Sequence, residues 1–232
     1  MTSDGRSPGG APARGVTRLL LVRHGESTWN AVRRWQGRAD PPLSERGEGQ
    51  ARDAVTIAAD QGPFDGVVTS TLRRARRTGD LLAEGLGVEV LGRLDDLSER
   101  DAGEWEGLTR DEIHLGYPGF LDEGRRPPGY EADDDVVARA GRALLELVRR
   151  RPGATLLVVS HGGVVNALER HSGEDWRRLD NLEGRWFAAA ADVDANATSD
   201  GAPASLRAEG PRIHLLGDPT VSDGDPPVPG YA

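Results

Sequence analysis

The 232-residue sequence contains no cysteine and no lysine. Without cysteine, the chain cannot form disulfide bonds, use a thiolate in catalysis or bind a metal through sulfur. All 29 basic residues are therefore arginine, and alanine, glycine, aspartate and proline are abundant, which indicates the coding bias of a GC-rich genome. No apolar stretch is long enough to cross a lipid bilayer, so a membrane-spanning protein is not expected.

The sequence also lacks an excess of positive charge, since its formal net charge is −9. A general nucleic-acid-binding protein would normally present a basic surface. A local cluster of arginines can nevertheless bind a small anion against the overall charge. Residues 1–15 contain no apolar segment of the kind found in secretory signals. We therefore expect a cytoplasmic protein that acts on a small molecule, with neither a nucleic-acid nor a membrane partner.

The pattern along the chain predicts one α/β domain. Residues 1–16 and 218–232 are rich in glycine and proline and are predicted to be disordered tails around a domain over 17–217. The predicted strands span 18–24, 64–70, 88–92, 154–160 and 184–191, and the predicted helices span 43–60, 71–87, 109–115 and 135–151. Segment 204–217 fits either an edge hairpin or an ordered tail. The alternation of strands and helices predicts a mainly parallel sheet with helices on both faces.

Two of the five histidines occupy the same local context. His24 and His161 each follow an apolar strand and precede a glycine and a predicted helix start. Because ligands bind beyond the carboxyl ends of parallel strands, we expect both histidines at one edge of the sheet, with Arg23 and either Arg73 or Arg74 beside them. A single histidine of this kind would be explained as a capping or turn residue. Two of them beside arginines favour a functional site.

The residues around these histidines suit phosphoryl chemistry. A glycine after each histidine lets the backbone approach a ligand closely, and a following helix offers free N–H groups to an anion. The planar guanidinium of arginine matches phosphate oxygens, although it would also bind a carboxylate. The histidine pair favours phosphate, because neutral imidazole is a competent nucleophile near pH 7.

Five sequence blocks occur in a family-specific order over roughly residues 18–190. They read RHGES..N, QG..D.PLSERG..QA, TSTLRRARRT, LSERDAGEWEGLT and VVSHGG. In this order they resemble the histidine phosphatase superfamily, in its phosphoglycerate-mutase-like group. The resemblance implies a three-layer α/β sandwich with a phosphate site at the carboxyl edge of the sheet.

The resemblance also implies roles for individual residues. His24 would be the nucleophile that forms a phosphohistidine, and His161 would complete the pocket. Glu99 falls where the family keeps its general acid. The positions implied to hold the phosphoryl group are Arg23, Asn30, Gln36, Gly37, Arg74 and Gly162. Of the two neighbouring arginines, Arg74 matches the family pattern and Arg73 falls at a variable position.

The general acid must protonate the leaving alkoxide, which requires a group with a suitably raised pKa. A more distant branch of the superfamily has an aspartate directly after the second histidine, whereas this chain has Gly162 there. Glu99 is then the main candidate, and after deprotonation it would activate the hydrolytic water. Glu99 could instead be a surface carboxylate. Glu26 is a rival, although in the first turn of a helix it would simply favour the helix dipole.

Arginines and a protonated His161 would stabilise the charge on the transferring phosphoryl group. No metal-ligand set and no cofactor are expected. The acidic residues of 132–136 are interpreted as the solvated start of an amphipathic helix.

The sequence favours a phosphatase over a mutase. Cofactor-dependent mutases carry ERHYG after the acid and then a long insertion, whereas this chain reads ERDAGEWEG, with Ala102 in place of the tyrosine. We therefore predict a phosphomonoesterase for a small phosphorylated metabolite, such as a sugar phosphate or glucosyl-3-phosphoglycerate. A phosphoglycerate mutase and a non-catalytic phosphate-binding relative stay open as alternatives, and a homodimer is common in the family.

The identity of the substrate stays open. Arg33, Arg34, Arg38, Arg125 and Arg126 could meet a second anionic group or could be ordinary surface residues. Phosphatases of sugar phosphates and of α-ribazole phosphate share the same core motifs.

Overall fold

A computed structural model describes residues 15–190 and 206–217. The predicted disorder of 1–16 and 218–232 falls outside these residues, except that Gly15 and Val16 are described and Val16 begins the first strand. Within the described residues, no helix is long and apolar enough to cross a membrane.

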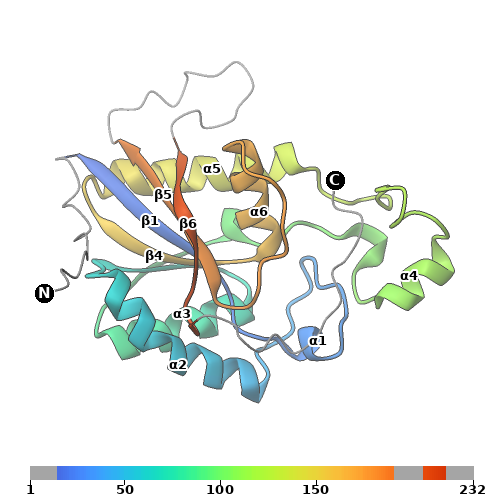
Figure 1. Cartoon of the computed structure of the whole chain (residues 1–232), viewed down its shortest axis with the longest axis horizontal. Coiled ribbons are helices and arrows are strands. Elements are labelled where there is room, and N and C mark those ends of the chain that lie inside the picture. Colours follow the sequence, from blue (N-terminus) through green and yellow to red (C-terminus); the bar gives the residue numbers. More distant parts are fainter. Residues whose placement is uncertain (1–14, 191–205, 218–232) are drawn as a thin grey trace, which may run out of the picture.

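Six strands form one mixed, mostly parallel sheet in the order β3-β2-β4-β1-β5-β6. Figure 1 labels β4, β1, β5 and β6 of this sheet. Their bounds are β1 Val16–Arg23, β2 Gly66–Ser70, β3 Val90–Leu94, β4 Thr155–Ser160, β5 Glu183–Ala190 and β6 Arg207–His214. Strands β1 to β4 run parallel, and β5 runs antiparallel to both of its neighbours. The predicted mainly parallel sheet is confirmed. In segment 204–217, the described residues 206–217 contribute one edge strand, β6, which pairs with β5 and with no second strand of these residues.

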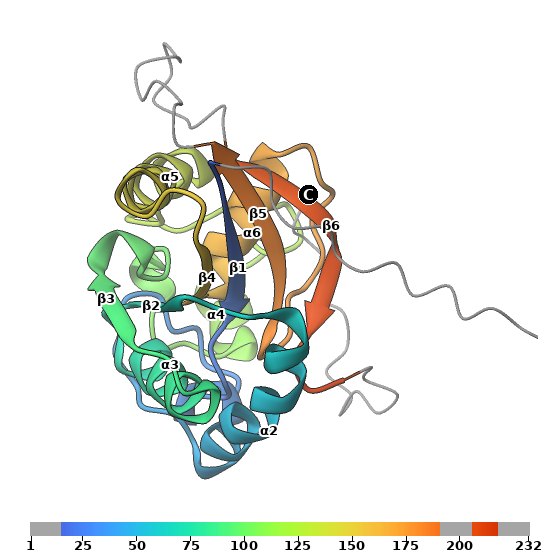
Figure 2. The same ribbon diagram turned by 90° about the vertical axis from the view of Figure 1, so that its left-hand side faces the viewer.

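Helices cover both faces of the sheet, which gives the predicted three layers (Figure 2). Helices α2 (Glu45–Gln61) and α3 (Arg73–Leu86) pack on one face, and α5 (Asp133–Arg150) and α6 (Gly162–His171) on the other. Strand β1 is buried on both sides because alternate side chains point to opposite faces. Its Leu19 and Leu21 join the cluster under α5 and α6, and its Leu20 and Val22 join the cluster under α2 and α3.

The predicted helix ends agree with the structure at two positions. Ser44 caps the N-terminus of α2, where its hydroxyl accepts a hydrogen bond from the amide of Gly47 at 3.0 Å. Helix α3 ends at Gly87, whose φ of 68° is the left-handed conformation that favours glycine. Smaller elements are α1 (Thr28–Ala31), α4 (Arg110–Gly116) and the short turns Asp95–Leu97 and Gly103–Trp105.

One expectation about the helices is wrong. Helix α6 does begin directly after His161, but residues 24–27 are not helical and only the four-residue α1 follows them. Ser27 is the cap of α1, so Glu26 lies before this helix and not in its first turn. The residues directly after His24 therefore offer no helix N-terminus to an anion.

The segment after His24 lies against the start of α2 through two glycines. The backbone amide of Ser44 donates to the carbonyl of Glu26 at 2.9 Å. A Cβ atom on Gly47 would lie 1.9 Å from that same carbonyl oxygen, and one on Gly25 would lie 2.7 Å from the carbonyl oxygen of Gly47. These close approaches leave no room for a side chain at either position.

Substituting Gly47→Ala should therefore destabilise the protein by about 1–3 kcal/mol, because the backbone must shift to relieve the overlap. Gly49→Ala is the matched control in the same helix, since a Cβ there meets nothing within 4 Å. The control should be neutral or stabilising by up to about 1 kcal/mol, because alanine has the higher helix propensity. Thermal unfolding of the two variants measures the difference, and equal stabilities would contradict the packing described here.

Candidate active site

Three strand ends bring the predicted core of the site together. Arg23 ends β1 and is followed by His24, Arg74 lies in the first turn of α3 after β2, and His161 follows β4. The two imidazole ring centroids are 5.1 Å apart, with an angle of 63° between the ring planes. The expected meeting of both histidines at one sheet edge is therefore what the structure shows.

His24 is held as a neutral imidazole with a defined tautomer. Its Nδ1 lies 2.6 Å from the carbonyl oxygen of Gly25 and donates to it, while its Nε2 accepts from Nε of Arg74 at 3.1 Å. The lone pair is thus on Nε2. Burial, followed by the charges of Arg74 and Arg23, lowers the pKa of His24 well below 6.5, against the opposing effect of the Gly25 carbonyl. The ring is consequently available as a nucleophile at neutral pH.

The backbone around His24 is fixed by side chains from other elements. The side-chain nitrogen Nδ2 of Asn181 donates to the carbonyl of His24 at 2.8 Å. The hydroxyl of Thr78 accepts from the backbone amide of Gly25 at 3.1 Å. Sequence reasoning missed Asn181, because it lies in an irregular segment without a recognisable pattern. Thr78 stood in a motif block, but nothing in the sequence assigned it a contact.

Arg74 is fully buried beside His24, whereas Arg73 is exposed. Its guanidinium donates to the carbonyls of Ala39 at 2.7 Å and Gly37 at 3.0 Å. Burial lowers the pKa of Arg74 to about 10, although nearby carboxylates oppose the change. Gly37 has φ of 52°, and a Cβ atom there would lie 2.8 Å from Ala102, so this position requires glycine. Of the two neighbouring arginines, Arg74 is the one that contacts His24.

His161 is also fully buried, and its Nε2 lies 2.9 Å from the hydroxyl of Ser70. Its Nδ1 is buried without a hydrogen-bond partner among the described residues. Burial, followed by the charges of Arg74 and His24, lowers the pKa of His161 well below 6.5. The expected protonated form is therefore disfavoured in this structure. An anionic phosphoryl group nearby would raise this pKa. The contact with Ser70 was not expected from the sequence.

A cleft of about 500 Å³ opens above these residues. Six of the nine predicted site residues line it, namely Arg23, Asn30, Gln36, Gly37, Glu99 and Gly162. The other three, His24, Arg74 and His161, are buried next to lining residues. The structure thus gathers all nine at one place.

Asn30 and Gln36 are oriented by one serine. The Oδ1 of Asn30 accepts from the amide of Ser27 at 3.1 Å, and the Oε1 of Gln36 accepts from the Ser27 hydroxyl at 2.7 Å. Because both amide oxygens are used in this way, the amide nitrogens are the groups that the two side chains can offer to an anion.

Glu99 is held at the cleft wall by backbone donors. Its carboxylate accepts from the amide of Arg100 at 2.8 Å and from the amide of Gly163 at 3.1 Å. A Cβ atom on Gly163 would lie 2.2 Å from a carboxylate oxygen of Glu99, so a side chain at this position would displace the carboxylate. The rival Glu26 does not line the cleft; it accepts from the Ser44 hydroxyl at 2.7 Å. Of the two carboxylates considered as the acid, Glu99 is therefore the one that lies at the cleft.

The outer cleft differs in part from expectation. Of the five arginines considered for substrate binding, Arg34 and Arg126 line the cleft, and Arg33, Arg38 and Arg125 do not. Further lining residues that the sequence did not assign to it include Arg100, Tyr130, Asp133, Asn166, Arg170, Trp176, Arg178 and Leu179.

Asp133 corrects the interpretation of 132–136 as a purely solvated helix start. Its carboxylate pairs with Arg100 at 2.6 Å and with Arg170 at 2.9 Å, and it lines the cleft. Among the described residues, no three histidine, aspartate or glutamate side chains are grouped so that they could hold a metal ion.

Arg139 is a buried residue that sequence reasoning missed. It lies in the interior of α5 and donates to the carbonyls of Asp96 and Ser98, both at 2.7 Å. Glu131 accepts from it twice, at 2.7 and 2.9 Å. Arg139 thereby fixes the backbone just before Glu99. An arginine among the apolar positions of an amphipathic helix is the sequence signal that could have revealed it.

The lowered pKa values give a direct prediction for the two histidines. Because burial and arginine charges disfavour the imidazolium form, both rings should stay neutral at pH 6, where an ordinary histidine is largely protonated. Ring ¹⁵N NMR, assigned with His24→Ala and His161→Ala, should show the Nδ1–H tautomer for His24. A protonated His24 at pH 6 without phosphate would contradict this electrostatic description.

Comparison with known proteins agrees with this geometry. Residues 19–190 match the histidine phosphatase superfamily (branch 1). The bifunctional protein Rv2228c of Mycobacterium tuberculosis is 41% identical over 177 residues, which cover 73% of this chain and 48% of that protein. The chain thus spans about half the length of this relative. The uncharacterized phosphatase PhoE of Bacillus subtilis is 35% identical over 153 residues, covering 66% of this chain and 76% of that protein.

Solved structures and further relatives extend the comparison. A mycobacterial glucosyl-3-phosphoglycerate phosphatase has a TM-score of 0.65 and 31% identity, over 77% of this chain and 93% of that chain. Proteins described as phosphoglycerate mutases also match, at 34–37% identity. Since the match covers most of the chain and includes every predicted site residue, the protein belongs to branch 1 of the histidine phosphatase superfamily.

Proposed function

We propose that the protein is a phosphomonoesterase that hydrolyses a small phosphorylated metabolite through a phosphohistidine on His24. The observation that carries this proposal is the neutral, tautomerically fixed His24, whose Nε2 faces the guanidinium of Arg74 in a buried site. A nucleophilic nitrogen beside a fixed cation is the arrangement that an anionic phosphoryl group requires.

In the first step, Nε2 of His24 attacks phosphorus while the ester P–O bond breaks. The hydrogen bond from Arg74 to Nε2 must be given up when the phosphoryl group arrives, and the guanidinium can then donate to a phosphoryl oxygen. Arg23 supplies a second cation at the cleft surface. Together they stabilise the charge that spreads over the phosphoryl oxygens in the transition state.

Glu99 is proposed to move the protons. Burial lowers the pKa values of Arg23 and Arg74, and the negative charge of Glu99 partly opposes this effect. Glu99 therefore lies close enough to interact electrostatically with both cations. Protonated Glu99 would donate to the leaving alkoxide. The resulting carboxylate would take a proton from water as that water attacks phosphorus, which breaks the N–P bond and releases phosphate.

The surroundings of the pocket support hydrolysis over phosphoryl transfer between two positions of a substrate. Ala102 lines the cleft at the place where a tyrosine follows the acid in mutases. A similar solved structure is a glucosyl-3-phosphoglycerate phosphatase, and that enzyme has also been solved with inorganic phosphate. We therefore propose a sugar phosphate or a phosphoglycerate derivative as the substrate. The relatives described as mutases make phosphoglycerate mutase the second candidate.

His24→Ala should lower the hydrolysis of p-nitrophenyl phosphate at least about 10³-fold, because no other group can form the covalent intermediate. His171→Ala, at the exposed end of α6, is the matched control and should keep parental activity. Phosphate release is measured for both variants, and circular dichroism checks the fold. Activity retained in folded His24→Ala would overturn the proposed mechanism.

The same assay on a phosphomonoester panel separates the two candidate functions. The panel includes glucosyl-3-phosphoglycerate, α-ribazole phosphate, sugar phosphates and phosphoglycerates. A phosphatase releases inorganic phosphate, whereas a mutase interconverts 2- and 3-phosphoglycerate with little release. Interconversion faster than release would replace the phosphatase proposal with a mutase.

Glu99→Gln should slow the hydrolysis of an alkyl phosphate at least about tenfold more than that of p-nitrophenyl phosphate, because nitrophenolate leaves without needing a proton. Asp133→Asn is the control, since Asp133 also lines the cleft but is paired with two arginines. It should affect both substrates similarly. Equal losses on both substrates in Glu99→Gln would assign the acid to another residue.

A further inference from the structure

The irregular segment 174–182, between α6 and β5, contacts Arg23 and His24 at the C-terminal end of β1 through three hydrogen bonds. Nη1 of Arg23 donates to the carbonyl of Leu179 at 2.6 Å. The amide of Leu182 donates to the carbonyl of Arg23 at 3.0 Å, and the side chain of Asn181 donates to the carbonyl of His24 at 2.8 Å. The conformation of this segment therefore sets where the Arg23 guanidinium lies.

The same segment forms one wall of the cleft, through Trp176, Arg178 and Leu179. It has no regular secondary structure, so ladder or helical hydrogen bonds do not hold its shape. Side chains from neighbouring elements must supply that restraint, because a free segment would gain backbone entropy by moving.

Arg212 of β6 supplies much of this restraint. Its Nη1 donates to the carbonyl of Arg178 at 2.8 Å, and its Nη2 donates to the carbonyl of Arg177 at 3.1 Å. These two consecutive carbonyls come directly before Leu179, which accepts from Arg23. The guanidinium of Arg212 thus binds the backbone directly before Leu179, whose carbonyl holds the guanidinium of Arg23.

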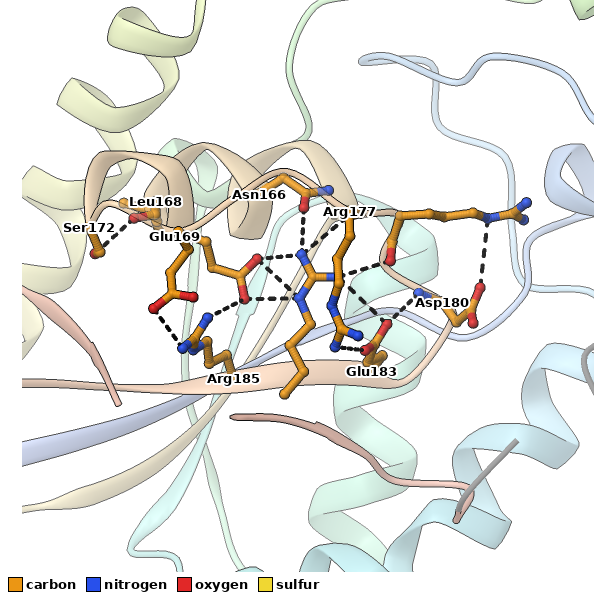
Figure 3. A network of polar contacts seen from close by, with 11 residues as sticks. Asn166, Leu168, Glu169, Ser172, Arg177, Asp180, Glu183 and Arg185 are labelled. Atoms are coloured by element: carbon orange, nitrogen blue, oxygen red, sulfur yellow. Dashed lines mark hydrogen bonds and ion pairs between the residues drawn. The ribbon is translucent and has the colours of Figure 1, made fainter. Parts of the chain in front are cut away.

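Arg212 also donates hydrogen bonds to two side chains of α6, those of Asn166 and Glu169. Its Nε donates to Glu169 at 3.0 Å, and its Nη2 donates to the side-chain oxygen of Asn166 at 2.7 Å. The Arg212 and Glu169 side chains are only 3% and 2% exposed, so the pair is shielded from solvent. Figure 3 shows Asn166 and Glu169 on the helix facing Arg177 and Glu183 across this network. Arg212 therefore ties the cleft wall to α6, whose N-terminus carries Gly162.

Glu183, at the start of β5, adds a second restraint on segment 174–182. Its carboxylate accepts from the amide of Asp180 at 2.9 Å and from the guanidinium of Arg177 at 2.8 Å, and it lies 3.8 Å from Nη1 of Arg212. Arg185 also pairs with Glu169, at 3.6 Å. The charges around Arg212 are thus the carboxylates of Glu169 and Glu183, the more distant Glu174, and the arginines that they bind.

We propose that Arg212 is a positioning residue for catalysis, which holds segment 174–182 so that Arg23 and the cleft wall are preset for the phosphoryl group. The proposal rests on the proposed role of Arg23 in phosphate binding. Arg212 lies on the edge strand β6, outside residues 19–190, over which the chain matches the family. Lysine cannot replace it, because a single ammonium cannot reach two carbonyls, a carboxylate and an amide in the planar arrangement of a guanidinium.

The test compares Arg212→Lys and Arg212→Met with the parent, and with Arg207→Met as an exposed control on the same strand. In both Arg212 variants, the KM for p-nitrophenyl phosphate and the inhibition constant of inorganic phosphate should rise about tenfold, the effect of losing hydrogen bonds made by a charged group. The kcat at saturation should change by less than about threefold. Amide hydrogen exchange at Asp180 and Leu182 should accelerate, and Arg207→Met should match the parent throughout.

A merely structural role gives a different result. It would reduce the amount of folded enzyme, and hence the apparent kcat, while leaving KM, phosphate inhibition and the exchange at Asp180 and Leu182 unchanged. That outcome in folded Arg212→Lys would overturn the proposal, and this variant decides the question if Arg212→Met does not fold. If the parent hydrolyses no phosphomonoester, the proposed function fails instead. Calorimetric binding of inorganic phosphate and amide exchange then still test the positioning by Arg212.

Discussion

The hydrogen bond from Arg74 to Nε2 of His24 is the interaction on which the rest of the site depends. It joins a buried cation to a buried neutral ring, and burial lowers the pKa of both groups. A buried charge is costly unless it is well hydrogen-bonded. The fold meets this need with the main-chain carbonyls of Gly37 and Ala39, which accept hydrogen bonds from the guanidinium of Arg74.

The sequence allowed the centre of the site to be predicted, for physical reasons that are local. Apolar strands that end in His24 and His161 are visible as short runs, and parallel strands must share an edge. Ser44 and Gly87 mark helix ends through side-chain capping and left-handed backbone, which depend on neighbouring residues alone. The supporting residues were not predictable in this way. Asn181 contacts a residue 157 positions away, and no periodicity marks such a contact.

Supporting arginines illustrate the same limit. Arg139 and Arg212 are buried and bind backbone carbonyls at 2.7–2.8 Å. In the sequence, Arg212 cannot be told from the many exposed arginines of a chain that uses no lysine, and Arg139 is marked only by its place among the apolar positions of a helix. Where the sequence did mislead, the cause was local as well: the residues after His24 remain extended because Ser27, not His24, caps the following turn.

The parallel register of β1 and β4 pairs Arg23 with Ser160, and the amide of His24 donates to the carbonyl of Ser160. The two histidines are therefore level with each other because two strands are aligned residue for residue. A slip of one residue in either strand would turn its side chains to the opposite face of the sheet. Single-residue insertions or deletions should consequently be excluded from these two strands during evolution, whereas the amino-terminal ends of the strands, away from the cleft, can vary in length.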